Sequence, residues 1–237
     1  MDSNNTVELI GIYGDDEIIA CSAWTSTSRE LTEEKRERIP KLLKDLWSNG
    51  HETPFEKGVL HFLVNCDVAS HIHLLKHRMS SLNAESARYK ELKEDKYYIP
   101  KDWIDLKITQ EIEMCDGDVP SYRANFHTWD KIIEDFTEES NRLYHECLNQ
   151  LTPILGRKRA KESARYFKTY NSQIQSDIMF NMRSFANFLK LRKSEHAQLE
   201  INKIASQMLK LVRQTGKFEH TLNAWGYSRI IDNGDME

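Results

Sequence analysis

The clearest pattern along the chain is a helical repeat of apolar positions between residues 129 and 151. Apolar side chains three and four residues apart lie on one face of a helix. The pattern therefore predicts one long helix, which we expect Thr152-Pro153 to end because proline lacks a backbone N–H. The apolar positions of this face are Trp129, Ile132, Ile133, Phe136, Leu143, Tyr144, Cys147, Leu148 and Leu151.

Shorter helical stripes occur on both sides of this segment. Thr32 is a good N-cap for one helix, and Pro40 inside that helix predicts a kink or a break. Asp67 can cap a second helix, and Ser194 can cap the last long one. The four stripes are Ile39, Leu42, Leu43, Leu46 and Trp47; then Val68, Ile72, Leu75 and Met79; then Ile178, Met182, Phe185 and Leu189; and finally Ile201, Ile204, Ala205, Met208 and Val212.

Strand patterns are fewer than helical ones. Residues 7–13 and the apolar run 59–65 predict two strands. We expect Thr53-Pro54 to be extended, because the residue before proline avoids the helical region. Residues 80–85 are expected to form a loop. The sequence Asp116-Gly117-Asp118 predicts a turn.

Composition narrows the class of protein. The chain has 237 residues, of which 39% are hydrophobic and 30% are charged, and its net charge is −4. This length suits one domain, or one compact unit with an elaboration, and the polar surface fits subunit contacts or large ligands. The acidic balance argues against a general nucleic-acid binder, so we expect no DNA partner.

Cysteine usage and hydropathy bear on the compartment. None of the four cysteines forms a CxxC pair, so neither a zinc site nor a redox motif is indicated. We expect reduced thiols in a cytoplasmic protein. The sequence shows neither a signal-peptide pattern nor an apolar run long enough for a membrane span, so no membrane partner is expected. The cysteines are Cys21, Cys66, Cys115 and Cys147.

Residues 76–89, which we call the signature segment, combine cationic, hydroxyl, amide and carboxylate groups with few large apolar side chains. Arg78 and Arg88 can donate two hydrogen bonds each to a phosphate or a carboxylate. Ser81, Asn83 and Ser86 can bind a sugar or a base edge. The composition favours a pocket for an anionic ligand. A solvated helix end and loop is the alternative.

Three other groups of polar residues could carry chemistry. Arg183 and Asn187 share the helix face opposite the apolar stripe, which is either a solvated face or, since asparagine is poor inside helices, a ligand-binding one. His71, His73 and His77 suggest a metal site, since histidines four residues apart on a helix can share an ion, but no third-ligand pattern accompanies them, so no metal is predicted. Ser86 has no identifiable base and is expected to position a ligand.

The signature segment resembles that of flavin-dependent thymidylate synthases, which reads Arg-His-Arg, seven residues, Ser, and then Arg-Tyr. Lys76 replaces the first arginine, whereas His77, Arg78, Ser86 and Arg88 match. Two further blocks are similar to the same family and occur in the same order. They are residues 51–56, His-Glu-Thr-Pro-Phe-Glu, and residues 181–192, followed by His196-Ala197-Gln198.

The resemblance implies roles for individual residues. Arg192 and Ser86 match catalytic positions. Arg165, in a helix expected over residues 160–167, falls on a phosphate-binding arginine by a gapless count from Asn181, although it also lies among several surface cations. The implied dUMP contacts are His73, Glu85, Ser86, Ala87, Arg88, Arg165 and Arg192. The implied FAD contacts are Thr53, Lys76, His77, Arg78, Ala84, Asn181, Arg183, Asn187 and His196.

The resemblance also implies a fold and an activity. The expected fold is α+β, with a mixed or antiparallel sheet flanked by long helices, in a single domain over residues 1–237 that forms a homotetramer. The expected reaction methylates dUMP to dTMP, with methylenetetrahydrofolate as carbon donor and NADPH-reduced FAD as hydride source.

Three departures from the family pattern, Lys76, His73 and Trp24, leave two alternatives open. Lysine keeps the positive charge of arginine but lacks its planar fork. One alternative is a flavin enzyme that makes a different C5 modification of a pyrimidine nucleotide, such as hydroxymethylation. The other is an inactive paralogue that binds a nucleotide or RNA.

Overall fold

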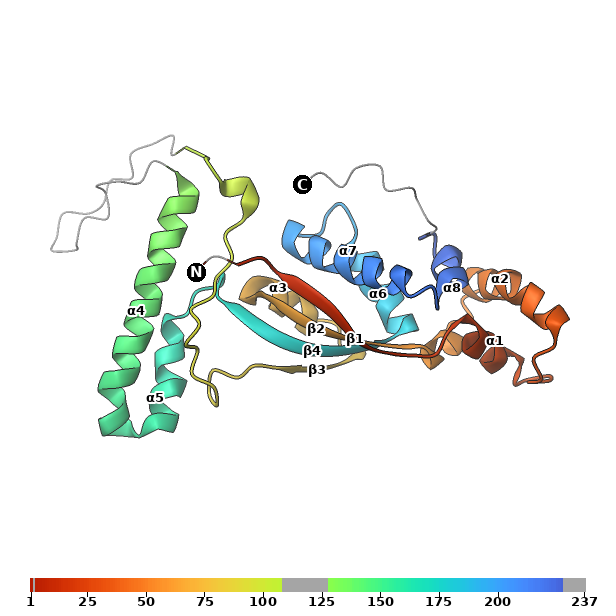
Figure 1. Ribbon diagram of the computed structural model, residues 1–237, viewed down its shortest axis with the longest axis horizontal. Helices are drawn as coiled ribbons and strands as arrows, with labels where there is room; N and C mark the ends of the chain where they lie inside the picture. The colour runs from red at the N-terminus through yellow and green to blue at the C-terminus, as the bar shows by residue number, and fades with distance from the viewer. Residues whose placement is uncertain (2, 108–127, 228–237) are drawn as a thin grey trace. The chain divides into compact units, whose positions relative to one another are not determined.

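The computed structural model describes residues 1, 3–107 and 128–227. Its centre is a four-stranded antiparallel sheet with the strand order β1-β2-β4-β3 (Figure 1). The strands are β1 (Thr6–Tyr13), β2 (Val59–Asp67), β3 (Ser80–Ala84) and β4 (Gln173–Asn181). The predicted α+β class is confirmed, as are the strands expected at residues 7–13 and 59–65.

Two of the four strands were not predicted. Ile178 was expected on a helix, but it lies in β4, where Ser176, Ile178 and Phe180 are buried and alternate with exposed neighbours. A period of two is typical of a strand. The helical pattern was predicted because Ile178 also lies at helical spacing from the apolar residues of the next helix. Residues 80–84 form β3 instead of a loop, at an edge of the sheet.

The chain divides into two compact units by its contacts. Unit 1 comprises Met1–Asn5, Asn65–Ile72 and Ala84–Gln175, and unit 2 comprises Thr6–Val64, His73–Asn83 and Ser176–Glu237.

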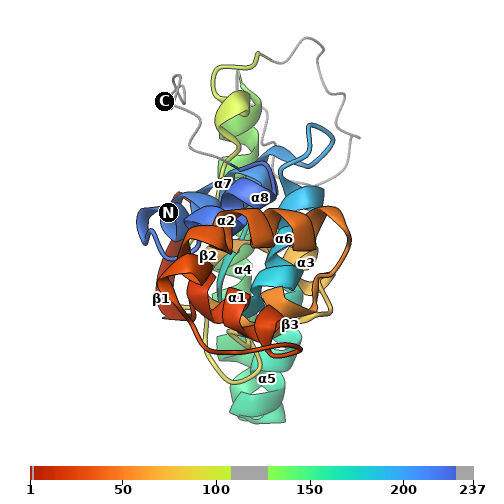
Figure 2. The same ribbon diagram turned by 90° about the vertical axis from the view of Figure 1, so that its right-hand side faces the viewer.

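Unit 2 contains two groups of helices, one of which packs on the sheet. Helices α6 (Met182–Arg192) and α7 (Leu199–Gln214) pack on each other, and α7 packs on β1. Helices α1 (Asp16–Trp24), α2 (Glu33–Ser48) and α8 (Glu219–Ala224) lie together, and Figure 2 shows them in front. The predicted stripe of α7 is confirmed, because its five residues are fully buried.

The core of unit 2 is rich in phenylalanine. The ring centroids of Phe185 and Phe188 on α6 lie 6.2 Å apart and nearly parallel, and Phe180 of β4 lies 5.2 Å from Phe188. Phe62 of β2 contacts Phe185 at 5.8 Å. All four side chains are fully buried, and each contributes about 1.5–3 kcal/mol by leaving water. This aromatic layer fixes α6 on the sheet.

Several predicted helix boundaries were right. Thr32 caps α2 by accepting a hydrogen bond from the Lys35 N–H. Asp67 caps α3 (Val68–Leu75) through the Ser70 N–H, at 2.7 Å. Both contacts satisfy an N–H that the first helical turn leaves without a partner.

Other local predictions were wrong. Helix α2 runs through Pro40 without a break. Thr53-Pro54 begins a 3₁₀ helix, η1 (Thr53–Lys57), because proline near a helix start needs no N–H partner. Ser194 does not cap α7, since α7 begins five residues later and the Ser194 hydroxyl donates to the Leu191 carbonyl.

The predicted stripe of α3 was also wrong. Leu75 and Met79 are exposed, and Leu74 is the buried apolar residue of the last turn. The reason is that α3 ends at Leu75, so Met79 does not share its face.

Unit 1 contains the long helix α4 (Trp129–Leu155), the short helix α5 (Arg157–Ala164) and the 3₁₀ turn η4 (Arg165–Phe167). Helix α4 continues past Pro153 and ends at Gly156, whose φ is +78°. Only part of its predicted apolar face is buried, because Tyr144 and Leu148 pack on Ala160 and Ala164 of α5, whereas Phe136 is 60% exposed.

The turn predicted at Asp116-Gly117-Asp118 lies outside the described residues. Over the part of the chain that is described, none of the helices combines the length and the apolar character that a membrane crossing requires.

Candidate active site

The signature histidine forms a direct contact with α6 inside unit 2. Arg192, in the last turn of α6, donates from Nε to His77 Nε2 at 3.0 Å. The His77 ring is buried and meets the Phe188 ring edge to face, at 4.9 Å between centroids. Burial and the neighbouring Arg192 and His73 lower the pKa of His77 to about 4. His77 is therefore neutral at pH 7, and its Nε2 is the hydrogen-bond acceptor.

The residues on either side of His77 point to solvent. Lys76 and Arg78 are exposed, and neither makes an ion pair with any residue that the structure describes. His73, one turn earlier in α3, has its Nε2 3.1 Å from Oε1 of Gln198. The cations of this turn are thus available to an anionic ligand, whereas the His73 ring is held by the segment before α7.

Two of the predicted site residues on α6 have structural partners. Asn181 caps the helix, because its side chain accepts a hydrogen bond from the Ser184 N–H at 2.8 Å. Arg183 pairs with Glu52 at 2.9 Å and with Glu56 at 2.8 Å. These pairs connect α6 to η1 and its preceding turn. They leave less of the Arg183 guanidinium for a ligand than the sequence implied.

Three further predicted residues of unit 2 lie on its surface. Asn187 is on the exposed face of α6, as predicted. Thr53 is the first residue of η1 and is exposed. His196 lies between α6 and α7, with 88% of its side chain exposed.

In unit 1, the second half of the signature segment forms a tight turn after β3. Ser86 accepts a hydrogen bond on its hydroxyl from the Arg88 N–H at 3.3 Å, and its carbonyl accepts from the N–H groups of Tyr89 and Lys90. Glu85 accepts from the Gln175 N–H and pairs with Lys90. Ala84 and Ala87 flank this turn and are half-buried. Among the described residues, the Ser86 hydroxyl forms no hydrogen bond to a carboxylate or an imidazole that could act as its base.

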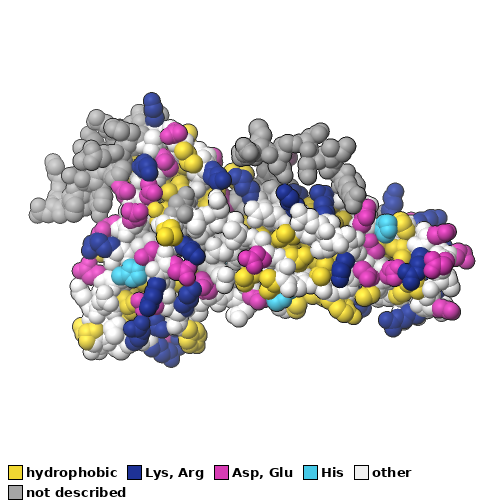
Figure 3. Space-filling model, in the orientation of Figure 1, with side chains coloured by type: hydrophobic (Ala, Val, Ile, Leu, Met, Phe, Trp, Pro, Cys, Tyr) yellow, Lys and Arg dark blue, Asp and Glu magenta, His cyan; other side chains and the backbone are white. Residues whose placement is uncertain are grey.

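The two predicted phosphate ligands of unit 1 lie in differing surroundings. The Nε of Arg88 pairs with Glu162 of α5, and these side chains are 44% and 20% exposed. Arg165 follows α5 directly and is exposed, with no ion pair to the described residues. Helix α5 also carries Arg157, Lys158, Arg159 and Lys161, and Figure 3 shows lysine and arginine side chains gathered over it.

The geometry therefore joins the three sequence blocks inside unit 2. His77 of the signature segment contacts Arg192 of the block at residues 181–192. Arg183 of that block contacts Glu52 and Glu56 of the block at residues 51–56.

Comparison with known proteins finds the same family that the three sequence blocks resemble. The family model of the thymidylate synthase complementing protein matches residues 8–215. The flavin-dependent thymidylate synthase of Pseudothermotoga lettingae is 34% identical over 225 residues, which are 95% of this chain and 89% of the relative.

The chain belongs to the flavin-dependent thymidylate synthase family.

Two further comparisons agree with this membership. The flavin-dependent thymidylate synthase of Thermotoga neapolitana is 31% identical and is covered to 85% of its length. Among solved structures, the UMP/dUMP methylase PolB from Streptomyces cacaoi, bound with 5-Br dUMP, has a TM-score of 0.74. Its sequence is 24% identical, with 96% of this chain and 98% of that chain covered, so it shows the fold.

The family resemblance located most candidate residues but not their partners. Glu162 was missed, although it lies on α5 three residues before Arg165. Glu52 and Glu56 were part of a matched block, but no role for them followed from the sequence. The only signal in the sequence is a carboxylate close to an expected arginine site. This signal does not identify the arginine with which the carboxylate forms an ion pair.

No group of three or more His, Cys, Asp or Glu side chains among the described residues could hold a metal ion. An open pocket of about 480 Å³ lies in unit 2, with Asp15, Arg36, Lys217 and His220 among its lining residues. It contains none of the predicted site residues.

Proposed function

We propose that this protein is a flavin-dependent thymidylate synthase that methylates dUMP at C5 to give dTMP. Family membership supports the reaction. The observation that carries the proposal furthest is the contact network in unit 2, where all three family blocks meet through His77, Arg192 and Arg183.

The nucleotide is assigned to arginines and to the signature turn. Arg88, Arg165 and Arg192 supply guanidinium groups that can bind a phosphate with two hydrogen bonds each. Ser86 positions the substrate through its hydroxyl. The remaining assigned contacts are His73, Glu85 and Ala87.

Arg192 has the catalytic role in this proposal. His77 accepts a hydrogen bond from the Nε of Arg192, which fixes the guanidinium and leaves its two terminal nitrogens for the substrate. A fixed cation stabilises negative charge that develops on a substrate ring, at little reorganisation cost. Because His77 is neutral, it orients Arg192 without adding a second positive charge.

The residues of unit 2 fit a flavin dinucleotide. Lys76 and Arg78 are exposed cations without carboxylate partners in the described part of the chain, which suits the diphosphate of FAD. A reduced flavin bound there supplies the hydride that completes the methyl group. The other contacts assigned in unit 2 are Thr53, His77, Asn181, Arg183, Asn187 and His196, and Ala84 of unit 1 is assigned as well.

The proposal includes methylenetetrahydrofolate as carbon donor and NADPH as reductant. It also includes a single catalytic domain over residues 1–237, a homotetramer and a cytoplasmic location. These follow from the family resemblance, and each can be measured separately from the reaction.

Absorbance of the purified protein tests the cofactor. We expect flavin bands that NADPH bleaches and air restores, and release of FAD when the protein is heated. A second assay, with dUMP and methylenetetrahydrofolate added, should then yield dTMP. A colourless protein that does not bind added FAD would contradict the proposal.

One alternative function has a specific observation behind it. His73 contacts Gln198, and Lys76 stands where the family has arginine, so the pocket can differ from that of its relatives. A related enzyme that adds a hydroxymethyl group at C5 would consume dUMP and give a product other than dTMP. Mass spectrometry of the product separates the two reactions.

A further inference from the structure

Residues 88–95, which we call the strap, continue from the signature turn and run along α4 and α5 in unit 1. Three of their groups contact α5: the Arg88 guanidinium, the Tyr89 carbonyl and the Glu91 carboxylate. A fourth, the Leu92 N–H, donates to the Tyr144 hydroxyl of α4 at 3.1 Å. On α5, Glu162 accepts from the Arg88 guanidinium. Lys161 donates to the Tyr89 carbonyl at 2.6 Å, and Arg157 donates to the Glu91 carboxylate at 2.5 Å.

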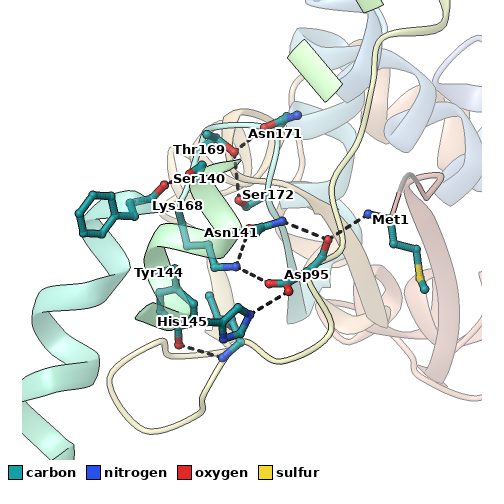
Figure 4. Close-up of polar contacts among 12 residues, drawn as sticks. Met1, Asp95, Ser140, Asn141, Tyr144, His145, Lys168, Thr169, Asn171 and Ser172 are labelled. Carbon is teal, nitrogen blue, oxygen red and sulfur yellow. Dashed lines mark hydrogen bonds and ion pairs between the residues drawn. The ribbon is translucent and has the colours of Figure 1, made fainter. Parts of the chain in front are cut away.

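The strap ends in a partly buried polar cluster around Lys168 (Figure 4). The Lys168 side chain is 9% exposed, and its Nζ lies 2.8 Å from Asp95 Oδ1 and 2.7 Å from Asn141 Oδ1. The same ammonium lies 4.5 Å from the centroid of the Tyr144 ring, a cation–π distance. Lys168 is thus surrounded by one carboxylate, one amide and one aromatic face.

Asp95 is the other centre of this cluster. Its Oδ2 lies 2.8 Å from Nε2 of His145, and its carbonyl accepts from Asn141 Nδ2 and from the amino group of Met1. Its φ is +48°, in the left-handed region that only glycine, asparagine and aspartate adopt readily. Burial opposes the charge of Asp95, but Lys168 and His145 outweigh it and keep its pKa below the usual value.

Helix α4 also fixes the other side of Lys168. The Ser140 hydroxyl donates to the carbonyl of Phe167, the last residue of η4. Thr137 exchanges hydrogen bonds with Asn171, whose side chain also accepts from Thr169. Figure 4 shows Ser140, Thr169 and Asn171 on this side of the cluster. The cluster therefore holds two segments on one helix, namely the strap that begins at Arg88 and the η4 turn that begins at Arg165.

We propose that the Asp95–Lys168 pair is a positioning element that sets the separation of Arg88 and Arg165, and thereby the affinity for the nucleotide phosphate. This rests on the proposed function, which assigns both arginines to dUMP. Asp95 and Lys168 act through the strap and η4 and do not touch the nucleotide. Nothing else in the proposed reaction uses this cluster, yet it buries the Lys168 ammonium and holds Asp95 in the left-handed region of the backbone.

The exposed ion pairs of Arg142 could not do the same. Arg142 on α4 pairs with Glu139 and Glu146 of its own helix, so it connects no second segment. Such exposed pairs contribute little to stability and are weakened by salt. The Asp95–Lys168 pair instead joins residues far apart in sequence, and its lysine side chain is only 9% exposed.

The test compares D95N, K168M, K168R, the double variant D95N/K168M and the control R142Q in the full-length holoenzyme. Asparagine tolerates the positive φ of Asp95, so D95N removes the charge and keeps the backbone. We expect D95N and K168M to raise the KM and the Kd for dUMP about tenfold, since small misplacements of binding groups are costly. The kcat at saturating dUMP and the FAD content should stay unchanged.

K168R should retain most of the wild-type affinity because it keeps the positive charge, and R142Q should match the wild type. The double variant leaves no unpaired buried charge, so its melting temperature should recover relative to K168M. Its KM for dUMP should nevertheless stay high, which separates positioning from stability.

Folded D95N and double variants that bind dUMP with wild-type affinity would overturn the inference, even if they melt at a lower temperature. The failure of the proposed function looks different. In that case the wild-type protein itself would neither bind dUMP nor form dTMP.

Discussion

In unit 2 the signature histidine is buried against Phe188 and hydrogen-bonded to Arg192, whereas in unit 1 Arg88 lies half-exposed against Glu162. The first contact belongs to an aromatic core, in which rings from β4 and α6 pack on one another. The second belongs to a basic surface whose groups are held by carboxylates. The residues assigned to ligands are thus held by packing in one unit and by charge in the other.

This difference predicts which changes should disrupt the contacts of each unit. The unit 2 contact should respond to core truncation and to protonation of His77, because packing and a neutral imidazole hold it. The unit 1 contacts should respond to removal of single charges, since little apolar surface is buried around them.

The largest effect should follow from truncating the core beneath His77. Phe188→Ala should lower the free energy of unfolding by about 3–5 kcal/mol, because a fully buried ring is lost and a cavity remains. Urea denaturation measures this change. Phe136→Ala on α4 is the matched control, since that ring is 60% exposed and its loss should cost under about 1 kcal/mol. Equal losses at the two positions would contradict the comparison.

Protonation of His77 should have the next largest effect. The pKa of His77 is about 4 in the folded protein and about 6.5 when unfolded, so the unfolded chain binds the proton more readily. Stability should therefore be full above pH 6.5 and fall by about 2–3 kcal/mol as the pH drops toward 4.

Denaturation curves of the wild type and of His77→Gln, recorded between these two pH values, test this. The variant should show a smaller loss over that range, because glutamine does not titrate. An identical pH dependence in both proteins would assign the loss to other groups, such as the carboxylates.

Removing one phosphate-binding arginine should weaken dUMP binding. Arg165→Ala and Arg192→Ala should each cost about 1.5–3 kcal/mol of binding free energy if each loses a charge-assisted hydrogen bond. Isothermal titration with dUMP measures both. Lys158→Ala is the control, because Lys158 is an exposed cation of α5 without an assigned role. Unchanged affinity in both arginine variants would refute the substrate assignment.

The smallest effect on stability should come from the exposed pairs of Arg183. Arg183→Gln should lower the free energy of unfolding only slightly, and by less in high salt, because both pairs are exposed to solvent. Denaturation at low and high salt measures this. A larger, salt-independent loss would show that the pairs to Glu52 and Glu56 resemble the buried contact of His77 more than the surface contacts of Arg88. A fall in FAD content would support the flavin contact assigned to Arg183.

The elements predicted well are those whose information is local. The stripe of α7 and the Asp67 cap depend on residues a few positions apart, and both are present. Strand β4 was missed because its alternation runs directly into the apolar face of α6, and a strand is defined by its neighbours in the sheet. Edge strand β3 has few apolar residues, so no local pattern marked it.

The candidate site shows the same difference between local information, which the sequence contains, and contacts that depend on the fold. The resemblance identified His77 and Arg192 separately, but their hydrogen bond depends on how α6 packs on the sheet. Arg183 was assigned to a flavin, and its pairing with Glu52 and Glu56 could not be foreseen, because those residues are more than a hundred positions away. Residue identity was readable from the sequence, whereas partnership required the fold.

The most direct test of the central claim is the mass of the nucleotide formed from dUMP by the purified protein. The reaction contains FAD, NADPH and methylenetetrahydrofolate, and the Arg192→Ala variant serves as the control. The proposed function predicts a product heavier than dUMP by one CH₂ group, formed by the wild type and strongly reduced in the variant. Recovery of unchanged dUMP from the flavin-loaded wild type, or a product that carries an additional oxygen, would contradict it.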